Sequence, residues 1–432
     1  MDCSYRGCFV VCVVTSLAAV ALYMIMNQSL NVFVVGGFML PTPNVKHLSL
    51  LEVTQKKSHV LHRQSVDITP AGSPHGTIKR FEANVKQVSL LEISQKHPLV
   101  LHRKSVKITS ACLQNGTLKH IVWMNYPRVD KPPTSFDHCN VRSCKMSINE
   151  TLISSADAVV VYSVNLPASK HPNNNMNQVW IMSGWESPVH YHSNTIFRSD
   201  WNGRFNWTLT YRLDSDIPFP YNRILYTGGT VNISDVLRRK SRSIAWFVSN
   251  CDTPSKREVY VKELQKYIGV DIYGACRNSK SFDCPKERFV HCLGLLNTTY
   301  RFYLSFENSL CKDYITEKFY NTFMTSAIPI VRGGADYARL LPEGTFINTA
   351  SFDSPKSLAK YIKYLERNET AMGYFLAKKH KYEYIDTYRT EFDWKCQLCA
   401  KLHGNIARKY YADMKQWLNT GTCLEQPKDL PL

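Results

Sequence analysis

Acidic side chains are scarce in this chain. Its 432 residues include 35 aspartates and glutamates against 53 lysines and arginines, which gives a formal net charge of +18. The chain also lacks a segment in which basic residues cluster among aromatic ones, because its cations are spread along the whole length. That absence argues against nucleic-acid binding, for which a concentrated basic face is expected. Attraction for an anionic substrate or an anionic membrane surface is a sufficient role for the excess charge.

A metal-ligand set is missing as well. Cys396 and Cys399 have the spacing of a zinc-binding pair, but no convincing second pair accompanies them. His62 and His102 have no cysteine, aspartate or second histidine at ligand spacing, which favours a solvated or packing role for both.

The cysteine and sequon content indicates an oxidising compartment. Fourteen cysteines are present, and closely spaced ones are expected to form disulfides in the secretory lumen. Two such pairs flank the central part of the chain: Cys139 with Cys144, and Cys396 with Cys399. Glycosylation sequons fit the same compartment, and the candidate sites are Asn115, Asn149, Asn232, Asn297 and Asn368.

An almost unbroken apolar run extends from Cys8 to Met26, with Arg6 before it. Its length is about that of a helix that crosses a bilayer, and the basic flank predicts a cytoplasmic N-terminus. A cleaved signal peptide is the alternative, because Ala19-Val20-Ala21 fits a small-x-small cleavage site. The run continues past that site, which favours a signal-anchor over residues 8–26 behind a cytoplasmic tail over residues 1–7. Either interpretation places the bulk of the chain in the secretory lumen.

A tandem duplication follows. Residues 44–79 and 84–119 are copies of one another, and alternating apolar and polar positions within them indicate a small β-type repeat. Two units rarely form a stable solenoid, so we interpret residues 27–117 as a stem that contains the duplication. The alternative, binding chemistry at the repeated Leu-His-Arg, lacks partner ligands.

From residue 121 onward, apolar segments alternate with polar or helical stretches. They are IVWMN, DAVVVYS, QVWIMSGW, IAWFVS, DIYGA, FYLSF, IPIVRG and TFINT. This alternation is typical of a parallel α/β fold. Pro218, Pro220 and residues 228–234 separate the first three segments from the rest. The sequence therefore predicts two Rossmann-like domains that face a cleft, over residues 118–235 and 236–400, followed by a tail over residues 401–432.

The stretch from Arg301 to Tyr337 has the composition of half a nucleotide site. Residues 302–306 form an apolar run that stops at Glu307 and Asn308, where polar groups stand at the carboxyl end of a buried strand. Ligands of open α/β sheets bind at that edge.

The residues that follow predict a helix. Asp313 is placed to cap it, and its apolar residues recur every four positions. Its first turns would project Tyr314, Glu317 and Lys318. Free backbone N–H groups at the helix start, together with the Lys318 ammonium, would form an anion site.

Two further strand ends carry candidate site residues. The strand over residues 244–248 ends near Asn250, and Arg257 would lie in the first turn of the next helix, where a guanidinium can grip a diphosphate oxygen. The strand over residues 179–182 delivers Glu186 beside Trp185, and a carboxylate so placed is suited to accept a proton. The simpler alternatives are a structural carboxylate at Glu186 and solvent-exposed cations at Arg257 and Lys318.

The segment ENSLCKDYITEKFY, residues 307–320, resembles the donor-binding signature of the α1,3-fucosyltransferases, which use GDP-fucose. The resemblance continues, in the order of that family, through WESP at residues 185–188, RFNWTLTYRLDSDIPFPY at 204–221 and AWFVSNC at 245–251. It covers roughly residues 118–399 and not the region before them.

The resemblance implies a GT-B fold, GDP-fucose as donor and a GlcNAc-containing N-glycan or glycoconjugate as acceptor, with α1,3 linkage and inversion at C1. It implies Glu186 as the general base and Arg257 and Lys318 as the cations that neutralise departing GDP. The remaining residues that we expect at the donor site are Asn250, Glu307, Asn308, Tyr314 and Glu317. It further implies a single-pass type II enzyme of the Golgi membrane in which both flanking cysteine pairs are oxidised. Whether the pairs join one another stays open.

Asp214 and Asp216 look like the Asp-x-Asp motif that chelates a divalent ion in metal-dependent glycosyltransferases of another fold. They lie in the half opposite the donor signature, and the family handles phosphate with basic residues. We therefore expect a structural or acceptor-side role for both and no required metal or cofactor, with a divalent ion at most a stimulant.

Alternatives to this interpretation are a transferase for another GDP-sugar and a lumenal lectin-like relative without turnover. The acceptor stays open between core and antennal GlcNAc, since it would be selected by loops such as residues 171–177 and 189–194. A homo-oligomer formed through the membrane and stem region is also left open.

Overall fold

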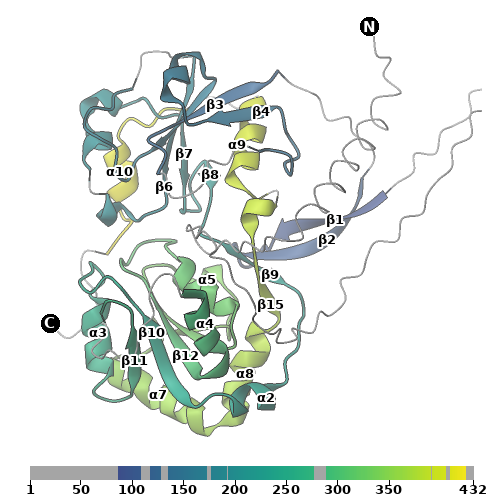
Figure 1. Ribbon diagram of the computed structural model, residues 1–432, viewed down its shortest axis with the longest axis vertical. Coiled ribbons are helices and arrows are strands. Elements are labelled where there is room, and N and C mark those ends of the chain that lie inside the picture. The colour runs from purple at the N-terminus through teal and green to yellow at the C-terminus, as the bar shows by residue number, and fades with distance from the viewer. Residues whose placement is uncertain are drawn as a thin grey trace, which may run out of the picture.

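A computed structural model of the protein describes residues 86–108, 117–127, 135–172, 177–191, 193–276, 289–390, 392–404 and 409–424. These residues form two α/β halves joined by a small sheet (Figure 1). The predicted signal-anchor, the first repeat copy and the Asn115 sequon lie outside the described residues. Among the described residues, no helix combines the length and the apolar character needed to cross a membrane.

The first half contains a six-stranded parallel sheet with the order β4-β3-β5-β6-β7-β8. Its central strands are buried on both faces, which is why their sequences are continuous apolar runs rather than alternating ones. Residues Val160 and Ile181 face one core, and their neighbours Val161 and Met182 face the other. The strands are β3 Lys119–Met124, β4 Cys144–Ser147, β5 Ala158–Tyr162, β6 Val179–Gly184, β7 Trp207–Thr210 and β8 Ile217–Pro218.

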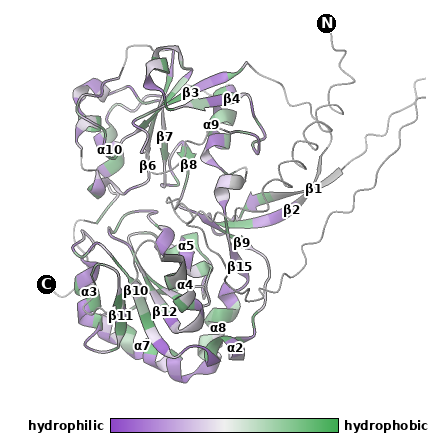
Figure 2. Ribbon diagram, viewed as in Figure 1, coloured by the Kyte–Doolittle hydropathy of each residue, from purple (hydrophilic) through white to green (hydrophobic). Residues whose placement is uncertain are grey.

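The second half contains a five-stranded parallel sheet with the order β11-β10-β12-β13-β14. The strands of both parallel sheets are mainly hydrophobic, whereas the surrounding helices carry many hydrophilic residues (Figure 2). The strands are β10 Arg242–Phe247, β11 Val270–Tyr273, β12 Tyr300–Phe306, β13 Ile328–Arg332 and β14 Ile347–Asn348. All eight predicted apolar segments thus form strands of parallel sheets, and the predicted α/β class with two parallel sheets is confirmed.

Helices cover both faces of the second sheet. Residues of α3 and α7 share one core, while α4 and α5 pack in separate clusters. The helices are α2 Ile233–Arg238, α3 Arg257–Leu264, α4 Phe289–Thr298, α5 Glu317–Phe323, α6 Tyr337–Leu340, α7 Pro355–Arg367 and α8 Glu369–Lys379. Short 3-10 helices supplement them at Glu150–Ser155, Pro188–His190, Thr195–Phe197, Ser199–Trp201, Thr349–Ser351 and Thr387–Arg389.

The end of the chain returns to the first half. Helix α9, Trp394–His403, packs against one face of the first sheet, and helix α10, Met414–Asn419, packs against the other (Figure 1). The predicted domain limit at residue 400 and the tail over residues 401–432 are therefore wrong. The apolar faces of β3, β5 and β6 need cover, and these two helices provide it.

Disulfides fix this return. Cys139 bonds Cys396 and Cys144 bonds Cys399, so the two flanking pairs are joined to one another. All four sulfurs are used in these bonds, which removes the zinc interpretation of the pair in α9. Further disulfides, which the sequence did not point to, link Cys251 with Cys276 and Cys311 with Cys423.

A mixed sheet with the order β1-β2-β9-β15 lies between the halves (Figure 1). Strands β1 Lys86–Ile93 and β2 Val100–Ile108 form an antiparallel hairpin within the second repeat copy. Strand β9, Arg223–Tyr226, carries the chain from the first half to the second, and β15, Tyr382–Ile385, carries it back. Because β2 pairs with β9, the second repeat copy belongs to the folded body, and its interpretation as stem is wrong.

The predicted glycosylation sites that the structure describes lie at the surface, whereas Asn206 of a further sequon, Asn206-Trp207-Thr208, is buried. Asn149, Asn232 and Asn297 are exposed and Asn368 is partly exposed. Three of them, Asn149, Asn232 and Asn368, cap the first turn of a helix with their side chains. Their occupancy by glycans stays a prediction.

Candidate active site

The two halves meet where strands β6 and β12 end. Tyr314, from the loop after β12, donates a hydrogen bond from its hydroxyl to Glu186 Oε2 at 2.8 Å. Beside it, the Oγ atoms of Ser187 and Ser309 share a buried hydrogen bond of 2.6 Å. The loop predicted to carry the base and the loop predicted to bind the donor are therefore in direct contact.

Glu186 follows strand β6 and is partly exposed. Its neighbour Trp185 is held in an aromatic cluster, stacked on Tyr162 and edge-on to Phe219. The Trp185 carbonyl accepts a hydrogen bond of 2.9 Å from the Tyr221 hydroxyl. Burial raises the pKa of Tyr162 to about 12, and the nearby Glu186 carboxylate adds to that shift. These contacts fix the backbone that presents Glu186.

Tyr314 differs from its predicted position. It does not project from a helix, because α5 begins at Glu317, and its side chain is only 1% exposed. Burial first, and then the neighbouring Tyr221 and Glu186, hold its pKa well above the usual range, so its hydroxyl stays a donor. Tyr314 therefore contacts the predicted base rather than standing free for a donor molecule.

Asp313 is not the cap of α5. It adopts a left-handed backbone conformation with φ of 58°, which aspartate tolerates better than most residues. Its carboxylate accepts hydrogen bonds from the Leu213 backbone N–H and from Arg339, each at 3.2 Å. The N-cap position of α5 is Thr316, which makes no side-chain cap.

The predicted anion site at the start of α5 is already filled by a carboxylate of the protein. Glu307 is fully buried and accepts hydrogen bonds of 2.8 Å from both the backbone N–H and the hydroxyl of Thr316. Burial raises the pKa of Glu307, and the Lys318 ammonium, 3.4 Å away, partly offsets that shift. A buried carboxylate needs hydrogen-bond donors. Glu307 therefore occupies the Thr316 backbone N–H, which was expected to remain free for an anionic ligand.

Lys318 bridges two carboxylates. Its ammonium lies 3.0 Å from Glu317 Oε1 and 3.4 Å from Glu307 Oε2. Burial acts to lower the pKa of Lys318, but Glu317 and Glu307 outweigh it and raise that pKa, so the ammonium stays charged. Its side chain is 21% exposed, and its ammonium also donates to the Thr316 hydroxyl at 2.8 Å.

Arg257 lies in the first turn of α3, as predicted, but it is buried rather than solvent-exposed. Its guanidinium donates to the Phe306 carbonyl at 2.8 Å and to the Asn250 carbonyl at 3.3 Å, so it ties the ends of two parallel strands together. Its Nε is buried without a hydrogen-bond partner among the described residues. Burial lowers the pKa of Arg257, while Glu307 acts against that shift.

Helix α3 begins without a side-chain cap. Lys256 occupies the N-cap position with φ of 49°, and Ser255 instead donates from its hydroxyl to the Glu307 carbonyl at 2.7 Å. Asn308 contacts the same segment, because its carbonyl accepts the Ser255 N–H at 3.0 Å. Asn250 and Asn308 thus border Arg257 through their backbones.

The Asp-x-Asp pair is engaged by cations of the protein itself. Asp214 accepts two hydrogen bonds from Arg212, at 2.9 and 2.8 Å, and one from Lys312 at 3.0 Å. Burial alone would raise the pKa of Asp214, but Arg212 and Lys312 outweigh it and lower that pKa to about 2. Asp216 pairs with Lys409 at 2.8 Å. Both carboxylates therefore have structural partners.

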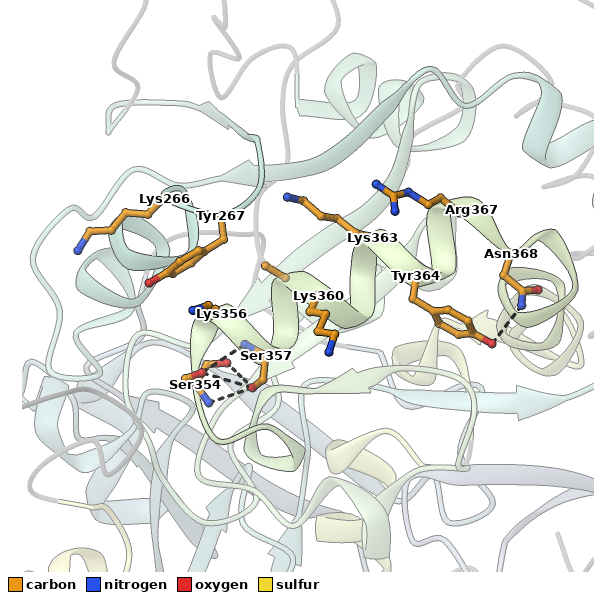
Figure 3. A pocket seen from close by; sticks show the side chains of 11 residues that line it. Lys266, Tyr267, Ser354, Lys356, Ser357, Lys360, Lys363, Tyr364, Arg367 and Asn368 are labelled. Atoms are coloured by element: carbon orange, nitrogen blue, oxygen red, sulfur yellow. Dashed lines mark hydrogen bonds between the residues drawn. The ribbon is translucent and has the colours of Figure 1, made fainter.

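A depression in the surface lies apart from these residues. It has a volume of about 910 Å³, runs along α7, and is lined mainly by cationic, hydroxyl and aromatic side chains (Figure 3). Its lining residues are Lys266, Tyr267, Ser354, Lys356, Ser357, Ala359, Lys360, Lys363, Tyr364, Arg367 and Asn368. None of the predicted base or donor residues lines it.

Sequence reasoning missed several residues that build the contact between the halves. Ser187 and Ser309 carry no signal as single serines, and Tyr221 lies at the end of a motif whose function the sequence does not state. Gly334 is a clearer case. A Cβ there would lie 2.3 Å from the Leu310 carbonyl carbon and 2.4 Å from the Cys311 nitrogen, so only glycine lets β13 end beside the donor loop.

The two parallel α/β halves touch through polar loops at their strand ends, the edge at which ligands of open α/β sheets bind. Two family models match the chain: "Fucosyltransferase, N-terminal" over residues 116–222 and "Glycosyltransferase family 10 (fucosyltransferase) C-term" over residues 237–417. The chain belongs to glycosyltransferase family 10, the fucosyltransferases.

Curated relatives agree. The chain is 36% identical over 289 residues to Glycoprotein 3-alpha-L-fucosyltransferase A of Drosophila melanogaster, an alignment that covers 65% of this chain and 55% of that protein. It is 34% identical over 314 residues to Alpha-(1,3)-fucosyltransferase 7 of Rattus norvegicus, covering 69% and 78%. A crystal structure of an α1,3-fucosyltransferase with GDP-fucose aligns at 17% identity and a TM-score of 0.45, over 71% of this chain and 96% of that one. The family assignment rests on the family models and the curated relatives.

Proposed function

We propose that this protein transfers fucose from GDP-fucose to O3 of a GlcNAc residue in a glycan, with inversion at C1 of fucose. Family membership and the names of the relatives support fucosyl transfer from GDP-fucose. One observation carries the mechanism. The only carboxylate of the Trp-Glu-Ser-Pro element, that of Glu186, is hydrogen-bonded to Tyr314 of the donor signature, so base and donor loop meet in one place.

In the proposed step, O3 of the acceptor attacks C1 of fucose while Glu186 takes the O3 proton. The new O3–C1 bond forms as the bond from C1 to the phosphate oxygen breaks, and GDP leaves with that electron pair. A single displacement of this kind inverts C1. The Tyr314 hydroxyl holds one Glu186 oxygen and thereby orients the other toward the acceptor.

The departing diphosphate would meet two cations. Arg257 presents a buried Nε that lacks a partner among the described residues, and a phosphate oxygen would satisfy that donor. Lys318 keeps its charge, and its side chain is 21% exposed. Glu307 and Glu317 hold the Lys318 ammonium in place. A charge that is already fixed does not have to reorganise when the diphosphate departs.

The acceptor would lie against the first half. The Trp185 indole N–H is buried without a partner in the described part of the chain, next to Glu186, and a sugar hydroxyl would complete it. Val189, two residues after Ser187, is 47% exposed and offers an apolar face to a sugar ring. These groups favour a glycan acceptor over a small anionic one.

An acceptor panel tests the proposal. The purified chain is supplied with GDP-fucose and, separately, with GDP-mannose, against core chitobiose, antennal N-acetyllactosamine and N,N-diacetyllactosamine glycans. We expect fucose on O3 of GlcNAc, with the linkage read by mass spectrometry and NMR. Faster transfer from GDP-mannose would indicate another GDP-sugar transferase, and glycan binding without any transfer would indicate a lectin-like relative.

We further propose a type II orientation in the Golgi membrane with the folded part in the lumen. The disulfides and the surface position of Asn149, Asn232, Asn297 and Asn368 support a lumenal location. Protease protection of sealed Golgi vesicles, combined with a mass shift on enzymatic removal of N-glycans, tests it. Cleavage of the folded part in intact vesicles would contradict the proposal.

A further inference from the structure

The start of the second strand of the hairpin β1–β2 shares a hydrophobic core with helix α5. Leu99 and Val100, at the start of β2, are each 1% exposed and share a core with Phe319 and Tyr320 of α5. Glu317 and Lys318 are the first two residues of the same helix. The second repeat copy therefore supports the element that carries the proposed donor cation.

The hairpin also contacts the strands that connect the halves. Val100 and Leu101 pair with Ile224 and Leu225 of β9, and the Ile224 N–H donates to the Leu99 carbonyl at 3.0 Å. Arg223, which starts β9, donates to the Pro98 carbonyl. Because β9 pairs in turn with β15, the hairpin extends a sheet made from both connections between the halves.

The duplication supplies an internal comparison. Position by position, His97, Pro98 and Leu99 of the second copy correspond to residues 57–59 of the first copy, where the sequence reads Lys-Ser-His. These three consecutive differences fall on residues that contact the folded body. The first copy would have to bury an imidazole in place of the Leu99 side chain, which is unfavourable without a partner.

We propose that the second repeat copy is part of the catalytic unit, in which Leu99 is a positioning residue that seats α5 and thereby Lys318 for donor binding. The inference rests on the proposed use of a GDP-sugar. The Lys57-Ser58-His59 sequence of the first copy does not suit the position that His97, Pro98 and Leu99 occupy.

The test exchanges residues between the copies in the full-length chain, purified in detergent. Pro98→Ser with Leu99→His gives positions 98 and 99 the residues of the first copy, and Ser58→Pro with His59→Leu is the matched control. We expect the first double variant to bind GDP at least about tenfold more weakly, because a small misplacement of a binding group is costly. Its KM for the glycan acceptor should stay unchanged. The control should match wild type in GDP affinity and in KM for the acceptor. Leu99→Ile, which keeps an aliphatic side chain of the same size, should bind GDP as wild type does.

Two further measurements separate positioning from simple loss of stability. Hydrogen exchange of the α5 amides should accelerate in the exchanged variant while exchange in β5 and β6 stays as in wild type. If that variant does not fold, Leu99→Val, which removes one methylene, replaces it and should show a smaller loss of GDP affinity. A lower melting temperature with unchanged GDP affinity, or an equal loss in the control, would overturn the proposal. Titration of GDP does not depend on which sugar is transferred, so failure of the proposed reaction would be recognised separately.

Discussion

Tyr314 and Glu186 come from opposite halves of the molecule, and a hydrogen bond of 2.8 Å joins the phenol of the first to the carboxylate of the second. The proposed base is thus oriented by a residue of the donor-binding loop. Packing keeps Tyr314 in place, since its ring stands edge-on to both Tyr211 and Tyr221. Any rearrangement of the donor loop would therefore move or release the carboxylate that would take the acceptor proton.

Tyr314→Phe keeps the ring and removes the hydroxyl. We expect kcat to fall by about tenfold to a hundredfold, since a hydrogen bond to a charged group contributes roughly 1.5–3 kcal/mol. GDP affinity, measured by calorimetry, should change little because the ring still packs against its neighbours. A variant with wild-type kcat would show that the hydrogen bond does not serve catalysis. Tyr410→Phe, at an exposed tyrosine, is a suitable control.

Glu186→Gln keeps the size and a hydrogen-bonding amide but removes the proton acceptor. We expect transfer to drop by about a hundredfold or more, the usual contribution of general base catalysis. GDP affinity should survive, whereas Lys318→Ala should lose affinity and transfer together. Near wild-type transfer by Glu186→Gln would place the base elsewhere. Asp214 and Asp216 would be weak replacements, because Arg212, Lys312 and Lys409 already hold them.

Arg257→Lys tests whether the fork of the guanidinium matters beyond its charge. One ammonium cannot reach the Phe306 and Asn250 carbonyls and a phosphate oxygen at once. We expect weaker GDP binding and a loss of stability of roughly 1–3 kcal/mol from carbonyls left unpaired. The measurements are GDP titration and chemical denaturation. Wild-type GDP affinity and wild-type stability would contradict the assignment of Arg257 to the donor site.

Lys379 predicts an unusual pH dependence of stability. Burial first, and then repulsion from Lys240, lower its pKa to about 7. The unfolded chain, with a lysine pKa of about 10.4, binds more protons between these values, so this residue makes the folded state more stable as the pH rises from about 7 to about 10. We expect the stability of wild type relative to Lys379→Met to increase over that window by at most about 1.4 kcal/mol per pH unit.

The stability difference between wild type and Lys379→Met should be flat below pH 7, because both folded and unfolded lysines are then protonated. Lys378→Met, at the neighbouring partly exposed position, is the control and should show no such rise. Denaturation at several pH values measures both. A difference that falls or stays level from pH 7 to pH 10 would contradict the burial of a lysine that loses its charge near neutrality.

The sequence predicted the strands of both parallel sheets because fully buried strands are apolar throughout and stop at polar residues. Glu186, Arg257 and Lys318 were placed correctly at strand or helix ends, although Arg257 proved buried. The start of α5 was misplaced because Asp313 takes a left-handed conformation, which no periodicity reveals.

Contacts between distant segments account for the remaining errors. The pairing of β2 with β9 depends on a register that neither strand specifies alone. The return of α9 and α10 to the first sheet could not be inferred, since the sequence of a helix does not specify which surface the helix covers. The partner of Cys311 is Cys423, far along the chain, and sequence spacing gave no hint of it.

The closure of the first half by α9 and α10 sets an order of events during synthesis. The strands of this half are made early, but the helices that cover their two faces, and the cysteines that bond Cys139 and Cys144, are synthesised later. Until then the first sheet exposes apolar faces and free thiols, a state that favours aggregation and mispaired disulfides. The second half can complete its core before the first, so a polypeptide cut short before residue 394 would retain a folded second half and present the first half to chaperones.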